Sequence, residues 1–239
     1  MGRAHEVRAA SMAATAAKKT KIYSRFGKEI YVAAKSGVPD PNMNQTLKRV
    51  IEKAKAAQVP ADVIKRNIEK AKGNSGEALI ENRYEGFGPG GSTIIIDTLS
   101  DNSMRALTEV KSAFNKARSN LGKAGCVSYQ YDNLGILSFK GTEDEVLDIL
   151  LMAEVDIDDT ESDEEGYVTV YVAPSDLFKA KDAIEAAKGE TEFVILETKL
   201  LAQETVTLND DDKAVFNRLL TLLDDCDDVQ QVYHNVENI

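Results

Sequence analysis

Three glycines, Gly86, Gly88 and Gly91, have the spacing G-x-G-x-x-G. In dinucleotide-binding enzymes this spacing follows a strand and opens a helix, whose N-terminus receives the pyrophosphate. Here residues 92–99 follow the glycines, and their β-branched side chains predict a strand. Residues 80–84 predict another short strand before them. The glycines therefore indicate a hairpin loop with positive φ angles, and we expect no cofactor.

Residues for catalysis or metal binding are few and far apart. Cys126 and Cys226 lie a hundred positions apart, and His5 and His234 lie near opposite ends of the chain. No C-x-x-C spacing and no nucleophile–base pair is present, and the acidic run at 158–165 lacks the ligand spacing of an EF-hand. We therefore predict a protein that is not an enzyme and that has no metal site.

Membrane insertion and secretion are not indicated by the sequence. No apolar run approaches the roughly 20 residues that span a bilayer. The first eight residues contain charged side chains and no apolar segment of the kind found in a secretory signal. We expect a cytoplasmic protein without a membrane partner.

Charge is segregated along the chain. Residues 1–75 contain 16 Lys and Arg against 6 Asp and Glu, and residues 76–140 contain 7 of each. Residues 141–239 contain 6 basic against 27 acidic residues, which brings the net charge to −11. A basic segment joined to an acidic one is typical of a module that binds a polyanion. Ordinary solvated helix faces are the alternative explanation.

The basic segment predicts three amphipathic helices. They cover residues 9–36, residues 44–57 with Asn44 as N-cap, and a segment that begins at Pro60. Apolar side chains recur on one face of each helix, and basic side chains occupy the others. Aromatic stacking could use Tyr23 or Tyr31, but core packing is the favoured role of both. The candidate phosphate contacts are Lys18, Lys19, Lys21, Arg25, Lys28, Lys48, Arg49, Lys53, Lys55, Lys65, Arg66, Lys70 and Lys72.

The remainder predicts an α+β organisation. Residues 134–205 have the order β-α-β-β-α-β of ferredoxin-like domains. A helix at 102–116 and a strand at 127–131 precede them, while the last helix and strand of the chain are too little for a domain. We therefore predict a helical domain at 1–77, a discontinuous domain of 78–133 plus 206–239, and an inserted domain at 134–205.

Several short motifs resemble the YebC family, whose mitochondrial relative is the translational activator of a cytochrome oxidase subunit. The most specific match is the stretch from Arg83 to Gly91, and the others are Asp101-Asn102 with Arg105, Asn120-Leu121-Gly122, and Val127-Ser128-Tyr129. The resemblance implies an α+β fold in which an N-terminal three-helix domain is followed by two ferredoxin-like α+β domains around a central cleft. The chain departs from the family pattern in its N-terminal arm and in having no Trp.

The resemblance also implies a non-enzymatic role in gene expression. Some members are described as DNA-binding transcriptional regulatory proteins, and others look like translation factors that bind the ribosome and relieve stalling at proline runs. The partner is then nucleic acid, either DNA or ribosomal RNA, and the sequence leaves both open. A protein partner of the acidic residues 141–239 could coexist with either. The candidate residues of the cleft are Arg83, Tyr84, Glu85, Gly86, Gly88, Pro89, Gly90, Gly91, Asn102 and Arg105.

Overall fold

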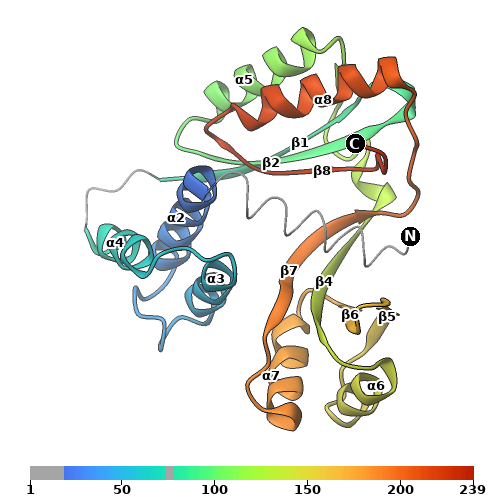
Figure 1. Cartoon of the computed structure of the whole chain (residues 1–239). Helices are drawn as coiled ribbons and strands as arrows, with labels where there is room; N and C mark the ends of the chain where they lie inside the picture. Colours follow the sequence, from blue (N-terminus) through green and yellow to red (C-terminus); the bar gives the residue numbers. More distant parts are fainter. Residues whose placement is uncertain (1–18, 74–77) are drawn as a thin grey trace. The chain divides into compact units, whose positions relative to one another are not determined.

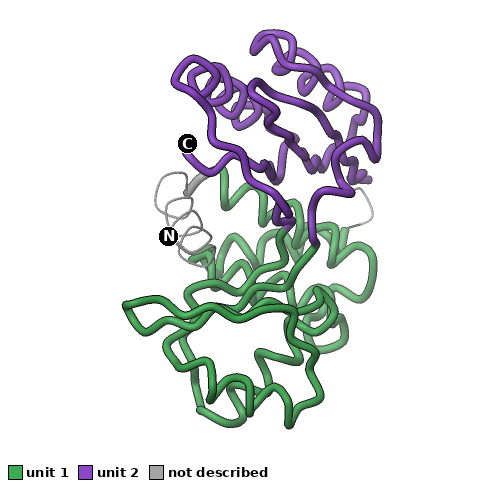
Figure 2. Tube along the Cα trace, turned by 90° about the vertical axis from the view of Figure 1, so that its right-hand side faces the viewer, with its two compact units in different colours: residues 1–76, 133–199 green, residues 77–132, 200–239 purple. Residues whose placement is uncertain are grey.

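The computed structural model describes residues 19–73 and 78–239. These residues form seven α-helices and two four-stranded antiparallel sheets, so the predicted α+β class is confirmed. The chain divides into two compact units (Figure 2). The described residues of unit 1 are 19–73 and 133–199, and those of unit 2 are 78–132 and 200–239. The three-domain division and the central cleft stay predictions.

Unit 1 begins with three short helices, which Figure 1 shows in blue and cyan: α2 (Lys19–Lys35), α3 (Gln45–Ala56) and α4 (Ala61–Lys72). The described part of the first predicted helix is α2. Asn44 caps α3, because its Oδ1 accepts the N–H of Leu47 at 3.0 Å. Its Nδ2 donates to the carbonyls of Ala33 and Val38 at 2.8 and 3.0 Å. One buried amide therefore joins the end of α2, the loop and α3.

The rest of unit 1 has the β-α-β-β-α-β order that the sequence predicted. Its elements are β4 (Tyr131–Lys140), α6 (Glu143–Met152), β5 (Ile157–Ser162), β6 (Tyr167–Val172), α7 (Leu177–Lys188) and β7 (Phe193–Ala202). The start of β4 and the end of β7 extend into unit 2. The strand order β5-β6-β4-β7 is that of a ferredoxin-like sheet, so this prediction is confirmed. The sheet and both helices share one core, which includes Leu137, Phe139, Val146, Leu150, Val170 and Ile184.

Unit 2 contains a second sheet, covered on one face by two helices (Figure 1). Its elements are β1 (Ile80–Phe87), β2 (Thr93–Ser100), α5 (Ser103–Lys116), β3 (Asn120–Leu121), α8 (Asp210–Asp224) and β8 (Val229–His234). The strand order is β3-β1-β2-β8, and Ile96 of β2 is paired with Val232 of β8. The last strand of the chain thus completes the sheet that residues 78–132 begin. The elements follow a different order here, β-β-α-β-α-β.

The expected strand at 127–131 is wrong. Residues 128–130 form a short 3₁₀ turn, and regular strand begins only at Tyr131. The reason lies in Glu85 of β1, whose carboxylate accepts the backbone N–H groups of Gly125, Val127 and Ser128 at 2.8, 2.6 and 2.9 Å. Two of these donors belong to the expected strand, and they are therefore not available to a neighbouring strand.

Glu85 is 4% exposed, and its carboxylate is nevertheless held in the ionised form. Burial opposes ionisation and is the largest single influence on its pKa. The hydrogen bonds from the three backbone N–H groups together outweigh it, so the pKa of Glu85 lies below the ordinary glutamate value. The charge therefore stabilises the folded chain at neutral pH.

Replacing Glu85 by Gln should lower the free energy of unfolding by about 2 kcal/mol at pH 7, since hydrogen bonds to a charged group are lost and the new amide N–H₂ faces other donors. Urea unfolding measures this loss. Glu81→Gln is the matched control, because Glu81 is an exposed glutamate on the same strand, and it should leave stability nearly unchanged.

The difference between wild type and Glu85→Gln should depend on pH. Because the pKa of Glu85 is lowered on folding, its contribution is complete above the ordinary glutamate pKa of about 4.3 and disappears as the pH falls through the lower folded value. The two proteins should therefore converge in stability as the pH is lowered from 7 to below the ordinary glutamate pKa. A difference that stays constant over this range would contradict the assigned charge.

Gly86→Ala should also destabilise unit 2. A Cβ atom at Gly86 would lie 2.4 Å from Cε1 of Phe114 and 2.7 Å from the carbonyl oxygen of Asn120. We expect the free energy of unfolding to fall by about 1–3 kcal/mol, as in other overpacked sites, measured by urea unfolding. Gly73→Ala is the control, because a Cβ there meets no atom closer than 3.5 Å, and an equally small effect of both substitutions would refute the explanation.

Candidate nucleic-acid interface

Four of the candidate phosphate contacts are exposed on the outer faces of α3 and α4. They are Lys48, Lys55, Lys65 and Arg66. Within residues 19–73 and 78–239, none of the four has an ion pair or a hydrogen bond from its side chain. Their charges are therefore available to a ligand.

Other candidates on these helices have partners within unit 1. The guanidinium of Arg49 lies 5.3 Å from the ring centroid of Phe178, and the Nζ of Lys70 lies 5.5 Å from that of Tyr31. The Nζ of Lys72 is 2.6 Å from Glu69 Oε1. These side chains offer less to a phosphate than the four exposed ones do.

Lys53 is the least accessible candidate. It is half-buried, and burial is the main cause that lowers its pKa below the ordinary lysine value, although the carboxylates of Glu29 and Glu197 oppose the shift. A half-buried amine with acidic neighbours is a poor phosphate contact. A phosphate would have to be desolvated to reach it and would be repelled by the neighbouring carboxylates.

The basic residues of α2 are less free than the sequence suggested. Lys21, Arg25 and Lys28 are half-buried, and each already has an interaction partner. Lys18 lies outside the described residues, and so does the side chain of Lys19. The exposed residues among the candidate phosphate contacts thus lie on α3 and α4.

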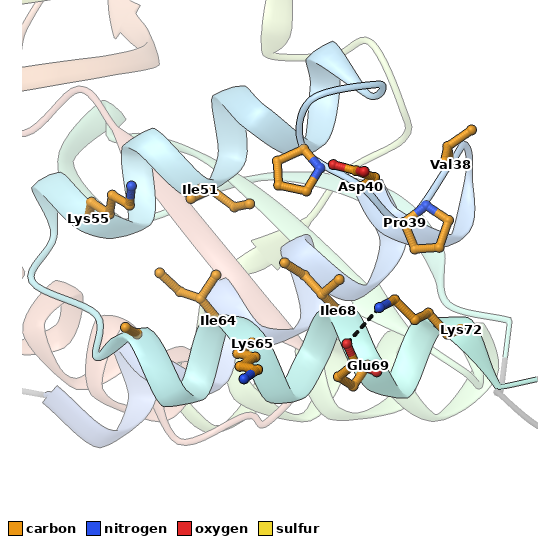
Figure 3. Close-up of a pocket in the computed structure, with 12 residues that line it drawn as sticks. Val38, Pro39, Asp40, Ile51, Lys55, Ile64, Lys65, Ile68, Glu69 and Lys72 are labelled. Atoms are coloured by element: carbon orange, nitrogen blue, oxygen red, sulfur yellow. Dashed lines mark hydrogen bonds and ion pairs between the residues drawn. The ribbon is translucent and has the colours of Figure 1, made fainter.

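A groove of about 630 Å³ lies between α3, α4 and the loop at 38–41 (Figure 3). Ile51, Ile64 and Ile68 form its apolar floor, and Lys55 and Lys65 lie at its edge. Asp40 and Glu69 also line the groove, so both signs of charge occur around its apolar floor, and the groove adjoins the candidate interface.

The glycine-rich stretch forms the predicted hairpin, because β1 leads through residues 88–92 into β2. Gly90 and Gly91 have φ angles of 61° and 78°, which favour glycine. Pro89 and Gly91 bound a single 3₁₀ turn, and the backbone N–H of Gly88 donates to the carbonyl of Ser92 at 2.8 Å. No helix N-terminus follows that could receive a pyrophosphate.

The polar residues expected in a cleft have partners inside unit 2. Arg83 donates to Asp97 through Nε and Nη2, at 2.6 and 2.8 Å, and this hydrogen bonding raises its pKa. The hydroxyl of Tyr84 donates to the Ser103 carbonyl, at 3.3 Å. Arg83 and Tyr84 therefore contribute to the fold of unit 2.

Asn102 and Arg105 are also engaged. The Oδ1 of Asn102 accepts the N–H of Arg105 at 3.0 Å and caps α5. Arg105 Nη2 lies 2.6 Å from Asp101 Oδ1 and 2.9 Å from Oδ2 of the buried Asp228. Removing Arg105 would take a cation away from a buried carboxylate, so Arg105 helps to neutralise Asp228 in the folded chain.

Two exposed aromatic residues were not among the predicted site residues. Phe87 ends β1 and is 40% exposed, and Tyr129 in the 3₁₀ turn is 70% exposed. Both lie in unit 2. The sequence contained one indication that the segment around Tyr129 differs from the rest of the chain. No Asp or Glu occurs between Glu109 and Asp132, although the chain contains 40 of these residues.

The acidic half has an exposed apolar patch on α6. Leu151 and Met152 are 76% and 88% exposed, and the exposed Asp144 and Asp148 lie on the same helix. Such a surface suits a partner with apolar and basic groups. A protein partner of the acidic half stays a prediction.

The described part of the chain was compared with two further kinds of site, a metal cluster and a membrane-crossing helix. No cluster of three or more His, Cys, Asp or Glu side chains there could hold a metal ion. None of the described helices combines the length and the apolar character that crossing a bilayer requires. Cys126 and Cys226 are both free thiols.

Comparisons with known proteins agree with this architecture. Residues 3–74 match the model of the TACO1/YebC protein N-terminal domain, and residues 79–236 match that of the TACO1/YebC second and third domain. A probable transcriptional regulatory protein of Pseudoalteromonas translucida (strain TAC 125) is 49% identical over 237 residues, which cover 98% of both chains. The probable transcriptional regulatory protein YeeN of Escherichia coli (strain K12) is 51% identical over 221 residues, 92% of each chain.

A solved structure has the same fold. The crystal structure of a conserved hypothetical protein from Aquifex aeolicus superposes with a TM-score of 0.76 at 31% sequence identity. The match covers 93% of this chain and 92% of that one. Together with the two family models, which match nearly the whole sequence, these relatives show that the chain belongs to the TACO1/YebC family.

Proposed function

We propose that the protein is a non-enzymatic, nucleic-acid-binding regulator of gene expression of the YebC type, acting as a DNA-binding transcriptional regulatory protein in the cytoplasm. One observation carries the proposal: exposed basic side chains without partners occupy two neighbouring helices of a chain with a net charge of −11. The relatives named as probable transcriptional regulatory proteins support it.

The chemistry of these side chains suits phosphate. Lysine and arginine release counterions when they neutralise phosphates, which gives affinity that falls with salt and that does not depend on base sequence. Residues 141–239 hold 27 acidic against 6 basic residues and repel a polyanion. Contact is therefore restricted to the parts of the chain where basic residues prevail.

A translation factor that binds ribosomal RNA and relieves stalling at proline runs is the alternative. The same lysines would serve it, because duplex DNA and folded RNA present similar phosphate charge. The exposed Phe87 and Tyr129 favour this alternative in one respect, since RNA recognition commonly stacks unpaired bases on aromatic side chains.

Removing Lys65 and Arg66 together should weaken nucleic-acid binding. In the variant Lys65→Ala/Arg66→Ala, the slope of log K against log salt should become shallower by about 0.9 for each lost contact with duplex DNA. Fluorescence anisotropy with a labelled duplex, between about 50 and 200 mM salt, measures this. Co-sedimentation of the same variants with ribosomes, at matched salt, shows which partner depends on these residues.

The matched control is Lys179→Ala/Lys188→Ala on α7. It also removes two positive charges, but from another helix of unit 1. There Lys179 donates to the Glu154 carbonyl, and Lys188 Nζ lies 2.5 Å from Glu145 Oε2. The control should bind with a slope close to that of the wild type. Equal slopes for wild type and Lys65→Ala/Arg66→Ala, on both DNA and ribosomes, would refute the assigned surface.

A further inference from the structure

Few of the aromatic side chains of this chain are exposed, since the others are buried or half-buried. The chain contains 8 Tyr and 7 Phe and no Trp, all within the described residues, and just two of these aromatic residues are exposed. They are Phe87 at 40% and Tyr129 at 70%. An exposed tyrosine alone needs no explanation. Two exposed aromatic residues in the same part of unit 2 do call for an explanation.

Both residues lie at the same end of the sheet of unit 2. Phe87 is the last residue of β1 and is paired with Asn120 of β3. The Gly122 backbone N–H donates to the carbonyl of Glu85 at 2.8 Å, and the Glu85 carboxylate holds the backbone next to Tyr129 through Val127 and Ser128. Tyr129 is thus presented by a segment fixed to β1.

The surrounding segment is basic, in contrast to the rest of unit 2. Between Glu109 and Asp132 there are four basic and no acidic residues. Lys116, Arg118 and Lys123 of this segment are exposed, and none has an ion pair within the described part of the chain. Because β3 lies between Arg118 and Lys123 and is paired with the end of β1, these cations lie near the end at which Phe87 and Tyr129 occur. We call Phe87, Lys116, Arg118, Lys123 and Tyr129 the basic end of unit 2.

The carboxylates nearest in sequence, Glu85 and Asp132, form no ion pair with these cations in the described part of the chain. The Glu85 carboxylate is buried and has three backbone donors. The Asp132 carboxylate accepts the side-chain amide of Gln203 at 2.9 Å. The basic end of unit 2 therefore combines exposed rings with exposed cations.

We propose that the basic end of unit 2 binds unpaired bases of a single-stranded nucleic acid, which stack on Tyr129 and Phe87 while Arg118 and Lys123 contact the flanking phosphates. Stacking on aromatic side chains with cations along the backbone is the general physical basis of single-strand binding. The inference rests on the proposed function and adds to it a second surface, specific for bases that are free to leave a duplex. RNA and DNA single strands share this chemistry.

Tyr129→Ala should weaken the binding of a single-stranded oligonucleotide by about 5- to 100-fold, since one stacking contact is lost. The salt slope should not change, because no charge is removed. Tyr129→Phe keeps the ring and should bind like the wild type. Binding of a perfect duplex should be unaffected by either variant, because its bases stay stacked on one another. Fluorescence anisotropy with the full chain on single-stranded RNA, single-stranded DNA and a duplex measures these affinities and the salt slope.

A 2-aminopurine base placed in the oligonucleotide gives an independent readout. Its fluorescence should be quenched on binding to the wild type and to Tyr129→Phe, and much less on binding to Tyr129→Ala. The RNA and DNA arms show which single strand is preferred. Lys123→Ala should make the single-strand salt slope shallower by about 0.7 for the lost phosphate contact.

The two proposals fail in different ways. If Tyr129→Ala binds and quenches like the wild type, the base-stacking surface is overturned, whatever the helical lysines do. If Lys65→Ala/Arg66→Ala keeps full affinity for all ligands while Tyr129→Ala loses single-strand binding, the basic end of unit 2 is upheld and the helical surface is wrong. Because Tyr129 is exposed, the unfolding midpoint of Tyr129→Ala should equal that of the wild type.

Discussion

The carboxylate of Glu85 lies where β1 and the irregular segment at 122–130 meet. An ionised group with 4% exposure would strongly destabilise the chain if it had no hydrogen-bond partner. Hydrogen bonds from three backbone N–H groups compensate for the hydration that this carboxylate loses on burial. The same bonds keep Val127 buried against Ile95, and Tyr131 completes this small core by hydrogen bonding to Thr93. The exposed position of Tyr129 follows from this anchor.

Local patterns predicted the regular elements well, and they failed where a distant partner decides the conformation. Asn44 was recognised as an N-cap because its role depends on residues three positions away. Residues 127–131 have the composition of a strand, but their conformation is set by Glu85, 42 positions before Val127, which no local pattern includes. The β-α-β-β-α-β order of unit 1 was readable because its elements are consecutive.

The candidate sites show the same limit. Helical periodicity indicated which faces of α3 and α4 are polar, but it did not indicate that Phe178 lies beside Arg49 or that Lys53 is half-buried near Glu197. The motif residues Arg83, Asn102 and Arg105 were candidate residues of a cleft, and the structure shows each bonded within unit 2. Residue type and family resemblance identify polar positions, while tertiary contacts decide which of these side chains remain available to a ligand.

Photo-crosslinking tests the central claim, nucleic-acid binding through exposed basic surfaces, most directly. The full chain would be irradiated with single-stranded RNA containing 4-thiouridine and with duplex DNA containing 4-thiothymidine, and the crosslinked peptides identified by mass spectrometry. We expect crosslinks to α3 and α4 with both ligands, and to residues 116–130 with the single strand alone. Crosslinks confined to the acidic residues 141–239, or none at near-physiological salt, would contradict this claim.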